Sequence, residues 1–336
     1  MSVALITGSL GLLGQSCVKR FKAAGLRVIG IDNNARTSYF GVEPLSNGEE
    51  HELYKADITQ KGLMGEVFQR HGKEISIIIH TAAQPSHDWS GIHPFKDFEI
   101  NAEATAFLLW LTKQYCPEAV FIYVSTSKVY GDFMNKKGYD ETDTRYSLRG
   151  YSDGFEEMDI SNNVLRSPFG ADKLAADIVA QEHGRYYGMK VGIFRPGCIT
   201  GPAHKGAELH GFLAYLVKCA KEGKQYEIYG YKGKQVRDNI HADDLAEAFF
   251  EFYKNPMMGE VFNIGGGKYA TVSILEAISY VEKKLGKEMV KTYIDTPRVG
   301  DHKWWVSCND KFRSYYRWNV TKTTEEILDE LIEHGK

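Results

Sequence analysis

The sequence predicts an α/β protein in which a Rossmann-type, doubly wound parallel sheet is joined to a smaller mixed α/β lobe that binds the substrate. Three observations support this class. Short apolar runs alternate with helical patterns through the first 194 residues, and a glycine-rich turn follows the first run. From about Pro196 onward, helices and short strands follow in a mixed order. A chain of 336 residues has room for about two such units.

The alternating pattern predicts each element of the first unit. Strands are expected at residues 3–7, 27–31, 52–56, 75–80, 120–125 and 191–194. Helices are expected from the glycine-rich turn to about residue 24, and at residues 59–71, 98–115 and 169–187. Right-handed crossovers then make the sheet parallel. Residues 131–168 interrupt the pattern with a long polar stretch, and a loop of that length is usually functional.

The rest of the chain predicts the second lobe. Helices are expected near residues 209–222, 242–253, 272–285 and 324–334, with short strands between them. No flexible linker separates the two units, so we expect them to pack tightly. We assign residues 1–194 and 235–263 to the cofactor-binding unit, and residues 195–234 and 264–336 to the substrate-binding lobe.

Composition excludes several classes of protein. Lys and Arg number 41 against 44 Asp and Glu, and this balance argues against a dedicated nucleic-acid-binding protein. No uncharged apolar run approaches the ~18 residues of a membrane helix, and the N-terminus lacks a signal-peptide pattern. The five cysteines are scattered without a C-x-x-C pair, and the histidines show no metal-binding spacing. We therefore expect a cytoplasmic protein that binds neither membrane nor metal.

The first strand is followed by a T-G-x-x-G-x-x-G turn at residues 7–14. Gly8 permits the tight turn, Gly11 lets a pyrophosphate approach the backbone, and Gly14 allows close helix–strand packing. The phosphates would then lie at the helix N-terminus. An ordinary turn can also contain three glycines, but the position between strand and helix favours a dinucleotide site.

Asp32 ends the second strand, where a carboxylate accepts hydrogen bonds from an adenosine ribose. Because it would repel a 2′-phosphate, Asp32 favours NAD over NADP. The alternative is a simple turn aspartate.

Further motifs resemble the extended short-chain dehydrogenase/reductase family that acts on nucleotide-sugars. Residues 80–83 are similar to the family's H-x-A-A segment, and residues 125–131 to its S-S/T-x-x-V-Y-G active-site strand end. Residues 233–241 and 263–266 are similar to second-lobe segments, so the resemblance covers the whole chain. Residues 125–131, 141–146 and 233–241 are most similar to the family members that invert C2 of a CDP-hexose.

The resemblance implies an NAD cofactor, a nucleotide-sugar substrate with a CDP-hexose favoured, and a homodimer formed through the helices at residues 98–115 and 169–187. Such an enzyme would oxidise a sugar carbon transiently and reduce it again on the other face. The cofactor-binding residues expected from the turn and the resemblance are Gly8, Gly11, Leu12, Leu13, Gly14, Asp32, Asn33, Asp57, Ile58, Ala82, Ala83, Asn101 and Lys173.

The family performs this chemistry with a Tyr-x-x-x-Lys pair and a nearby hydroxyl side chain. Lys173 matches the lysine, whose charge favours the phenolate form of the tyrosine, and Thr126 matches the hydroxyl residue. A solvated helix lysine and a strand-end threonine are the alternatives. The tyrosine position holds Phe169, which has no oxygen, so the family's usual base is missing.

Other residues could supply the base. His87 and Asp88 directly follow the fourth strand, where ligands bind in open α/β sheets. A histidine titrates near neutral pH and can act as the base with Asp88 orienting it, although the pair can also simply shape a polar loop. Tyr146 and Tyr151 in the long polar stretch are further candidates.

The substrate contacts are implied by the resemblance. Arg237 and Arg298 are similar to the two arginines that clamp the diphosphate, since guanidinium pairs with phosphate through two hydrogen bonds; surface arginines are the alternative. Cys198 stands where many relatives carry a sugar-contacting asparagine, so we expect a different sugar pocket. The expected substrate-binding residues are Gln84, Lys128, Cys198, Leu209, His210, Arg237 and Arg298.

These observations predict an NAD-dependent nucleotide-sugar epimerase, with C2 epimerisation of a CDP-hexose favoured and Phe169 in place of the tyrosine. Two alternatives stay open. One is 4-epimerisation or dehydration on the same scaffold, and dehydration is disfavoured because those members carry an Asp-Glu pair where this chain has Ser127 and Lys128. The other is a relative that binds nucleotide-sugars without catalysis.

Overall fold

The computed structural model describes residues 2–35, 37, 48–204, 206 and 211–335. Within them, seven parallel strands form the central sheet in the order β12-β8-β5-β4-β1-β2-β3. This confirms the predicted doubly wound sheet. The strands are β1 (Val3–Thr7), β2 (Arg27–Asp32), β3 (Glu52–Lys55), β4 (Ile75–His80), β5 (Val120–Val124), β8 (Val191–Pro196) and β12 (Glu260–Ile264).

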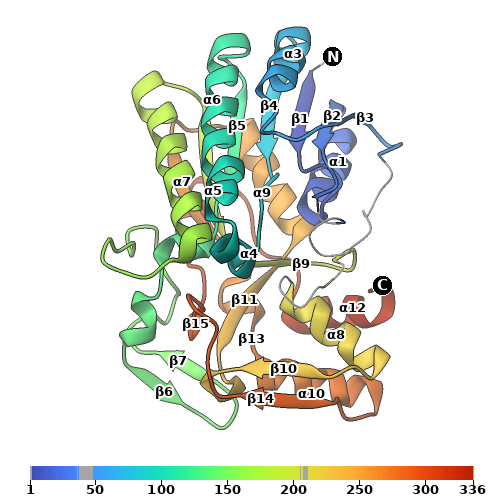
Figure 1. Cartoon of the computed structure of the whole chain (residues 1–336), viewed down its shortest axis with the longest axis vertical. Coiled ribbons are helices and arrows are strands. Elements are labelled where there is room, and N and C mark those ends of the chain that lie inside the picture. Colours follow the sequence, from blue (N-terminus) through green and yellow to red (C-terminus); the bar gives the residue numbers. More distant parts are fainter. Residues whose placement is uncertain (1, 36, 38–47, 205, 207–210, 336) are drawn as a thin grey trace.

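Helices cover both faces of this sheet (Figure 1), so the strands β1 and β5 are buried along their whole length. Alternate residues of β1 face opposite layers: Leu5 packs with one cluster and Ile6 with the other. The first layer contains α3 (Lys61–His71), α6 (Ala104–Tyr115) and α7 (Ser167–Tyr187). The second contains α1 (Leu12–Ala23) and α9 (Ala242–Lys254).

Two helical segments differ from the expected pattern. The helix expected at residues 98–115 begins earlier, as α5 (Pro94–Phe98), and continues into α6 through a π-helical turn at Glu99–Glu103. Residues after the fourth strand also form a short helix, α4 (His87–Ile92). The side chain of Ser86 caps α4 by accepting a hydrogen bond from the backbone N–H of Trp89.

The second lobe occupies the lower half of the molecule in Figure 1. In it, β11 (Val236–His241) pairs with β9 (Cys198–Thr200), β13 (Thr271–Ser273) and β15 (Trp304–Trp305). A separate parallel pair joins β10 (Tyr226–Tyr229) to β14 (Lys291–Ile294). The helices that share this lobe's core are α8 (Phe212–Glu222), α10 (Ile274–Leu285) and α12 (Thr324–His334).

The two units exchange segments more than the sequence predicts. Strand β11 is expected in the cofactor-binding unit but pairs within the smaller lobe. In the long polar stretch, β6 (Tyr139–Glu141) and β7 (Tyr146–Leu148) form a hairpin, and Phe155 stacks on Trp305 of the second lobe. Conversely, α11 (Asp310–Tyr315) packs on the first unit through Phe312. Phe155 and Phe312 are fully buried at these contacts, and sequence periodicity does not reveal where such rings will meet.

Candidate active site

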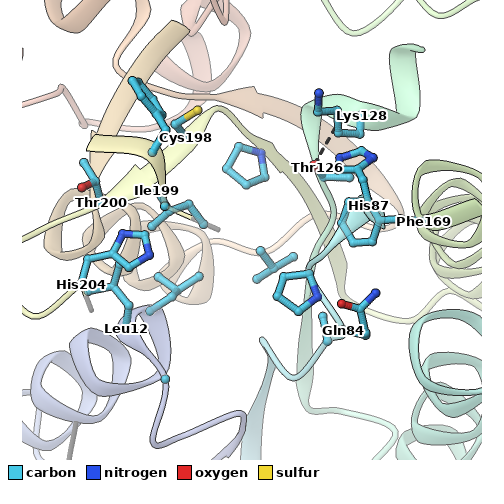
Figure 2. A pocket seen from close by; sticks show the side chains of 18 of the residues that line it. Leu12, Gln84, His87, Thr126, Lys128, Phe169, Cys198, Ile199, Thr200 and His204 are labelled. Atoms are coloured by element: carbon cyan, nitrogen blue, oxygen red, sulfur yellow. Dashed lines mark hydrogen bonds between the residues drawn. The ribbon is translucent and has the colours of Figure 1, made fainter. Parts of the chain in front are cut away.

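A cavity of about 760 Å³ opens where the carboxyl ends of the parallel strands meet the second lobe. Its wall combines residues from the glycine-rich turn, the ends of β4 and β5, the start of α7 and several second-lobe segments. Figure 2 shows His87, Phe169, Thr126 and Lys128 on one side of this cavity and Cys198, Ile199, Thr200 and His204 on the other. Ligands bind at this position in open α/β sheets.

The glycine-rich turn leaves no room for side chains. A Cβ atom on Gly8, whose φ is 73°, would lie 2.7 Å from the Thr81 hydroxyl oxygen, and one on Gly14 would lie 2.0 Å from the Gly8 carbonyl oxygen. Helix α1 begins after Gly11, and among the described residues neither a side-chain cap nor an acidic first-turn residue is found there. The positive end of this helix is therefore available to an anion in the cavity.

Acidic side chains form the neighbouring rim. Asp32 accepts hydrogen bonds from the backbone N–H groups of Leu10, at 2.9 Å, and Asn34, at 2.7 Å. Asn33 donates to the Asp57 carboxylate at 2.8 Å. Burial acts to raise the pKa of Asp57, but hydrogen bonds from Thr59 and Asn33 outweigh it and lower the pKa. Asp32, Asn33, Asp57 and the adjacent Ile58 all line the cavity, as do Leu12, Leu13, Ala82 and Ala83.

Asn101 supports the cavity wall from behind. It accepts a hydrogen bond from the backbone N–H of Gln84 at 3.1 Å and donates to the Gln84 carbonyl at 3.0 Å. We expected Asn101 to contact the cofactor; instead it lies outside the lining of the cavity in the described part of the chain. Gln84 does line the cavity, but its amide already bonds Ser86 and the Asp97 carboxylate.

The structure brings His87 and Phe169 together. Their rings meet edge to face with centroids 4.9 Å apart, and both line the cavity with Asp88. His87 Nδ1 lies 2.8 Å from the hydroxyl oxygen of Ser167, a residue that we did not single out from the sequence. Ser167 opens α7 with a φ of 66°, a conformation uncommon for a residue other than glycine. We expected Asp88 to orient His87, whereas Ser167 provides the contact at Nδ1.

The two tyrosine candidates are not at the site. Within the described residues, neither Tyr146 nor Tyr151 lines the cavity. Tyr146 lies under the Lys303 ammonium, and Tyr151 packs against Phe155 with ring centroids 4.7 Å apart. Their suggested role as the base is therefore a wrong expectation, because the long polar stretch packs them into the second lobe.

Lys173 and Thr126 line the cavity beside Phe169. Lys173 Nζ donates to the Val124 carbonyl at 2.7 Å and lies over the ring of Tyr123. Burial lowers the pKa of Lys173 to about 7, although Asp177 and Asp97 oppose the shift. The Thr126 hydroxyl caps the turn that follows β5 by accepting from the Lys128 N–H at 3.3 Å.

A buried ion pair holds this end of the sheet. Arg195 in β8 donates two hydrogen bonds of 2.9 Å to Asp177 in α7, and the Ser125 hydroxyl donates to the same carboxylate at 2.6 Å. Because the three residues come from β8, α7 and the end of β5, the network fixes α7, and with it Lys173 and Phe169, against the sheet. No motif in the sequence predicts this pairing.

The second lobe contributes a charged cluster centred on Asp301. One carboxylate oxygen accepts hydrogen bonds from Lys128 Nζ at 3.1 Å, from Arg237 at 2.7 Å and from the backbone N–H of His302 at 3.0 Å. Burial acts to raise the pKa of Asp301, but Arg237 and Lys128 hold it well below its usual range. Burial lowers the pKa of Lys128, and Asp301 opposes that shift.

The other expected substrate residues have mixed outcomes. Arg298 lines the cavity with its guanidinium 4.3 Å above the ring of Tyr229. Cys198 also lines it, and burial raises the pKa of its thiol, so the thiol stays protonated. Leu209 and His210 lie outside the described residues. His302 lines the cavity, but we did not single it out from the sequence, although it directly follows Asp301 and lies four residues after Arg298.

Comparison with known proteins identifies the class. The family model "NAD dependent epimerase/dehydratase family" matches residues 4–265, and the chain belongs to this family. It is 30% identical to CDP-paratose 2-epimerase of Salmonella typhi, over 97% of each chain. It is 26% identical to UDP-glucuronate 4-epimerase of Thermodesulfobacterium geofontis, over 100% of this chain and 97% of the relative.

Solved structures show the same fold. UDP-glucose 4-epimerase of Thermotoga maritima with UDP-glucose superposes with a TM-score of 0.82 at 23% identity, covering 99% of this chain and 98% of that one. The Thermus thermophilus UDP-glucose 4-epimerase complex with NAD gives a TM-score of 0.80 at 23% identity with the same coverage.

The cofactor of the family is NAD, and the residues present fit it. The turn at Gly8 and Gly14 has no space for a Cβ, the N-terminus of α1 suits a pyrophosphate, and Asp32 is an acceptor suited to ribose hydroxyls. Across the described ranges, no group of three or more His, Cys, Asp or Glu is placed to hold a metal ion. A search of those same ranges finds no helix long and apolar enough to cross a membrane.

Proposed function

We propose that the protein is an NAD-dependent nucleotide-sugar epimerase that inverts C2 of a CDP-hexose, with His87 acting as the base in place of the family's tyrosine. The observation that carries this proposal is the contact between His87 and Phe169, because it places a titratable ring beside the position that lacks a phenol. The 30% identity to CDP-paratose 2-epimerase over almost the whole chain supports the substrate and the carbon.

NAD, when bound, supplies the reversible oxidation of the sugar carbon. His87 would transfer the proton: in the tautomer whose Nδ1–H donates to Ser167, Nε2 is the acceptor nitrogen and would take the proton of the sugar hydroxyl. When the ketone is reduced on its other face, the same nitrogen returns that proton, so the reaction needs no net proton change. The hydroxyl of Thr126 lines the same wall and can donate to the sugar oxygen while it carries negative charge.

In this scheme Lys173 acts on both the substrate and the cofactor. Because its pKa is about 7, Lys173 is partly charged at neutral pH. Its charged form would stabilise the sugar oxygen after the proton has left and would bind a ribose hydroxyl of the cofactor. Thr126 and Lys173 therefore act on the substrate oxygen and the cofactor, and His87 replaces the phenol.

The cations of the second lobe would hold the diphosphate. Arg298 and Arg237 come from separate segments and both line the cavity, and guanidinium groups pair well with phosphate oxygens. Cys198, protonated and half-buried, would contact the sugar without carrying charge.

We also propose a homodimer that forms through α5, α6 and α7. These helices carry large apolar side chains that are exposed in the single chain, including Phe95, Trp110, Ile178 and Tyr186. Large apolar side chains exposed on neighbouring helices support an interaction site there, and light scattering would measure the assembly. The absence of disulfides among the five cysteines supports placing the protein in the cytoplasm.

A second candidate is 4-epimerisation of a UDP-sugar, favoured by the full-length similarity to UDP-glucuronate 4-epimerase. A third is a relative that binds nucleotide-sugars without turnover, favoured by Phe169. Incubation with CDP-, UDP-, GDP- and dTDP-hexoses in deuterated water, followed by NMR, separates them. Inversion at C2 of a CDP-hexose without deuterium incorporation supports our proposal, and inversion at C4 supports the second candidate. If no donor gives a product although NAD is bound, both epimerase candidates are overturned and the non-catalytic candidate is supported.

A further inference from the structure

His302 is a buried residue in the cavity wall with an unused polar atom. It lies between β14 and β15, is only 1% exposed, and lines the cavity. Its Nε2 atom is buried, and no hydrogen-bond partner for it is found among the described residues. Buried polar atoms in folded proteins are normally hydrogen-bonded, so an unpaired nitrogen on a residue that lines a ligand cavity indicates that the ligand supplies its partner.

The backbone around His302 is held rigidly. The side chain of Asn135 donates to the Asp301 carbonyl at 2.7 Å and accepts from the Lys303 N–H at 2.7 Å, so it clamps the chain on both sides of His302. The backbone N–H of His302 bonds the Asp301 carboxylate, and its ring lies against Trp305 with centroids 5.5 Å apart. A ring fixed in this way loses little freedom when it binds.

The surroundings keep the imidazole uncharged. Burial lowers the pKa of His302 well below its usual value, Lys128 and Arg237 lower it further, His87 acts in the same direction, and Asp301 opposes them. A neutral imidazole has one donor and one acceptor nitrogen and no charge to offer a phosphate. Its natural partner is a hydroxyl group.

The position of His302 indicates which hydroxyl it meets. Its backbone N–H bonds the Asp301 oxygen that also pairs with Lys128 and Arg237, the two cations that would face the diphosphate. His87, which would face the reacting carbon, lines the same cavity. The group that lies between a diphosphate and a reacting sugar carbon is the sugar ring itself.

We propose that His302 binds a hydroxyl of the hexose through Nε2 and so selects which sugar, and which orientation of it, the site accepts. This inference rests on the proposed function, since it assumes that a nucleotide-sugar enters the cavity. His302 would thus determine specificity for the sugar and leave binding of the nucleotide to other residues.

Calorimetry with the NAD-loaded protein tests this directly. CDP and CDP-glucose are titrated as a pair, and UDP and UDP-glucose as a second pair, so that the difference within a pair reports the sugar alone. We expect His302→Phe to weaken binding of the nucleotide-sugar about tenfold or more, as expected for loss of one buried hydrogen bond, while binding of the nucleoside diphosphate stays the same. His302→Gln, which keeps a donor and an acceptor, should restore part of the loss.

Two controls keep the result interpretable. His71 is also a buried histidine, but it bonds Tyr54 of β3 and is not among the described residues that line the cavity. His71→Gln should therefore change binding of neither the nucleoside diphosphate nor the nucleotide-sugar. The second control uses nucleotide-sugars in which the glucose lacks one hydroxyl group. Their binding to the wild-type protein can be measured without relying on the folding of a variant. One of them should bind more weakly than the glucose parent, and His302→Phe should abolish that difference.

The outcomes separate the two hypotheses. Equal weakening of nucleotide and nucleotide-sugar, or an unchanged sugar contribution in His302→Phe, overturns the role of His302 and leaves the proposed function standing. If the wild-type protein binds none of the nucleotide-sugars, the proposed function fails, and the role of His302 fails with it.

Discussion

The imidazole of His87 lies edge-on to the phenyl ring of Phe169, with the ring planes inclined at 64°. The two residues come from separate helices, and a hydrogen bond from the Phe169 N–H to the Ser90 hydroxyl ties α7 to α4 at this point. The phenyl ring stands where the sequence resemblance places the family's tyrosine, and it presents no oxygen to the cavity. The titratable ring in contact with it on that wall is the imidazole of His87.

Replacing His87 should remove the base. We expect His87→Ala to lower kcat by about 10²–10⁴, the usual contribution of a general base, and to leave NAD binding unchanged. Adding Phe169→Tyr to that variant should recover part of the activity, because the new phenol would lie beside Lys173, whose charge favours phenolate. Steady-state kinetics of the two variants provide the measurement. A His87→Ala enzyme within a few-fold of wild type contradicts the assignment.

Substitutions at Ser167 should separate orientation of His87 from backbone strain. Ser167→Ala and Ser167→Gly both remove the hydroxyl partner of Nδ1, so both should lower kcat, by about tenfold. Because φ is 66° at this residue, the glycine variant should be more stable than the alanine variant by about 1 kcal/mol. Urea denaturation measures the stability difference. Equal kcat in wild type and both variants would show that the hydroxyl does not orient the base.

Removing the charge of Asp301 should leave two cations without their counter-ion. Lys128 and Arg237 both pair with this carboxylate, so Asp301→Asn should destabilise the protein by about 3 kcal/mol. Pyrophosphate should raise the melting temperature of the variant more than that of wild type, since it can replace the lost negative charge. Asp140→Asn is the matched control, because its ion pair with Arg149 is exposed and should contribute little. If pyrophosphate raises the melting temperatures of the wild type and of Asp301→Asn by the same amount, the cations do not form a diphosphate site.

Lys173 should make stability depend on pH in a defined direction. Its folded pKa is about 7, below its ordinary value of 10.5, so between these values the unfolded chain holds a proton that the folded chain has released. The free energy of unfolding attributable to this group therefore rises with pH across that window, by at most about 1.4 kcal/mol per pH unit. The free energy of unfolding of Lys173→Met should exceed that of the wild type by the largest amount below pH 7. The difference should then shrink as the pH rises. A pH-independent difference in urea unfolding would contradict the shift.

The sequence by itself determined the sheet, because the alternation of apolar runs and the chemistry of the glycine turn are local signals. It also predicted the cofactor rim at Asp32 and Phe169 as the departure from the family, since both predictions follow from position in a motif. Only the tertiary structure decided that Ser167, 80 residues away along the chain, supports His87. It likewise placed β11 in the smaller lobe and moved Tyr146 and Tyr151 away from the cavity.

The surroundings of His302 and Asp301 could likewise not be predicted from the sequence. Their neighbours Asn135, Lys128 and Arg237 come from distant segments, and the orphaned nitrogen exists only because those segments close around it. Periodicity and turn chemistry record how a segment packs against its own neighbours in the chain. Contacts between remote segments depend on how large aromatic and charged side chains are buried together, and that outcome is fixed only when the whole chain has folded.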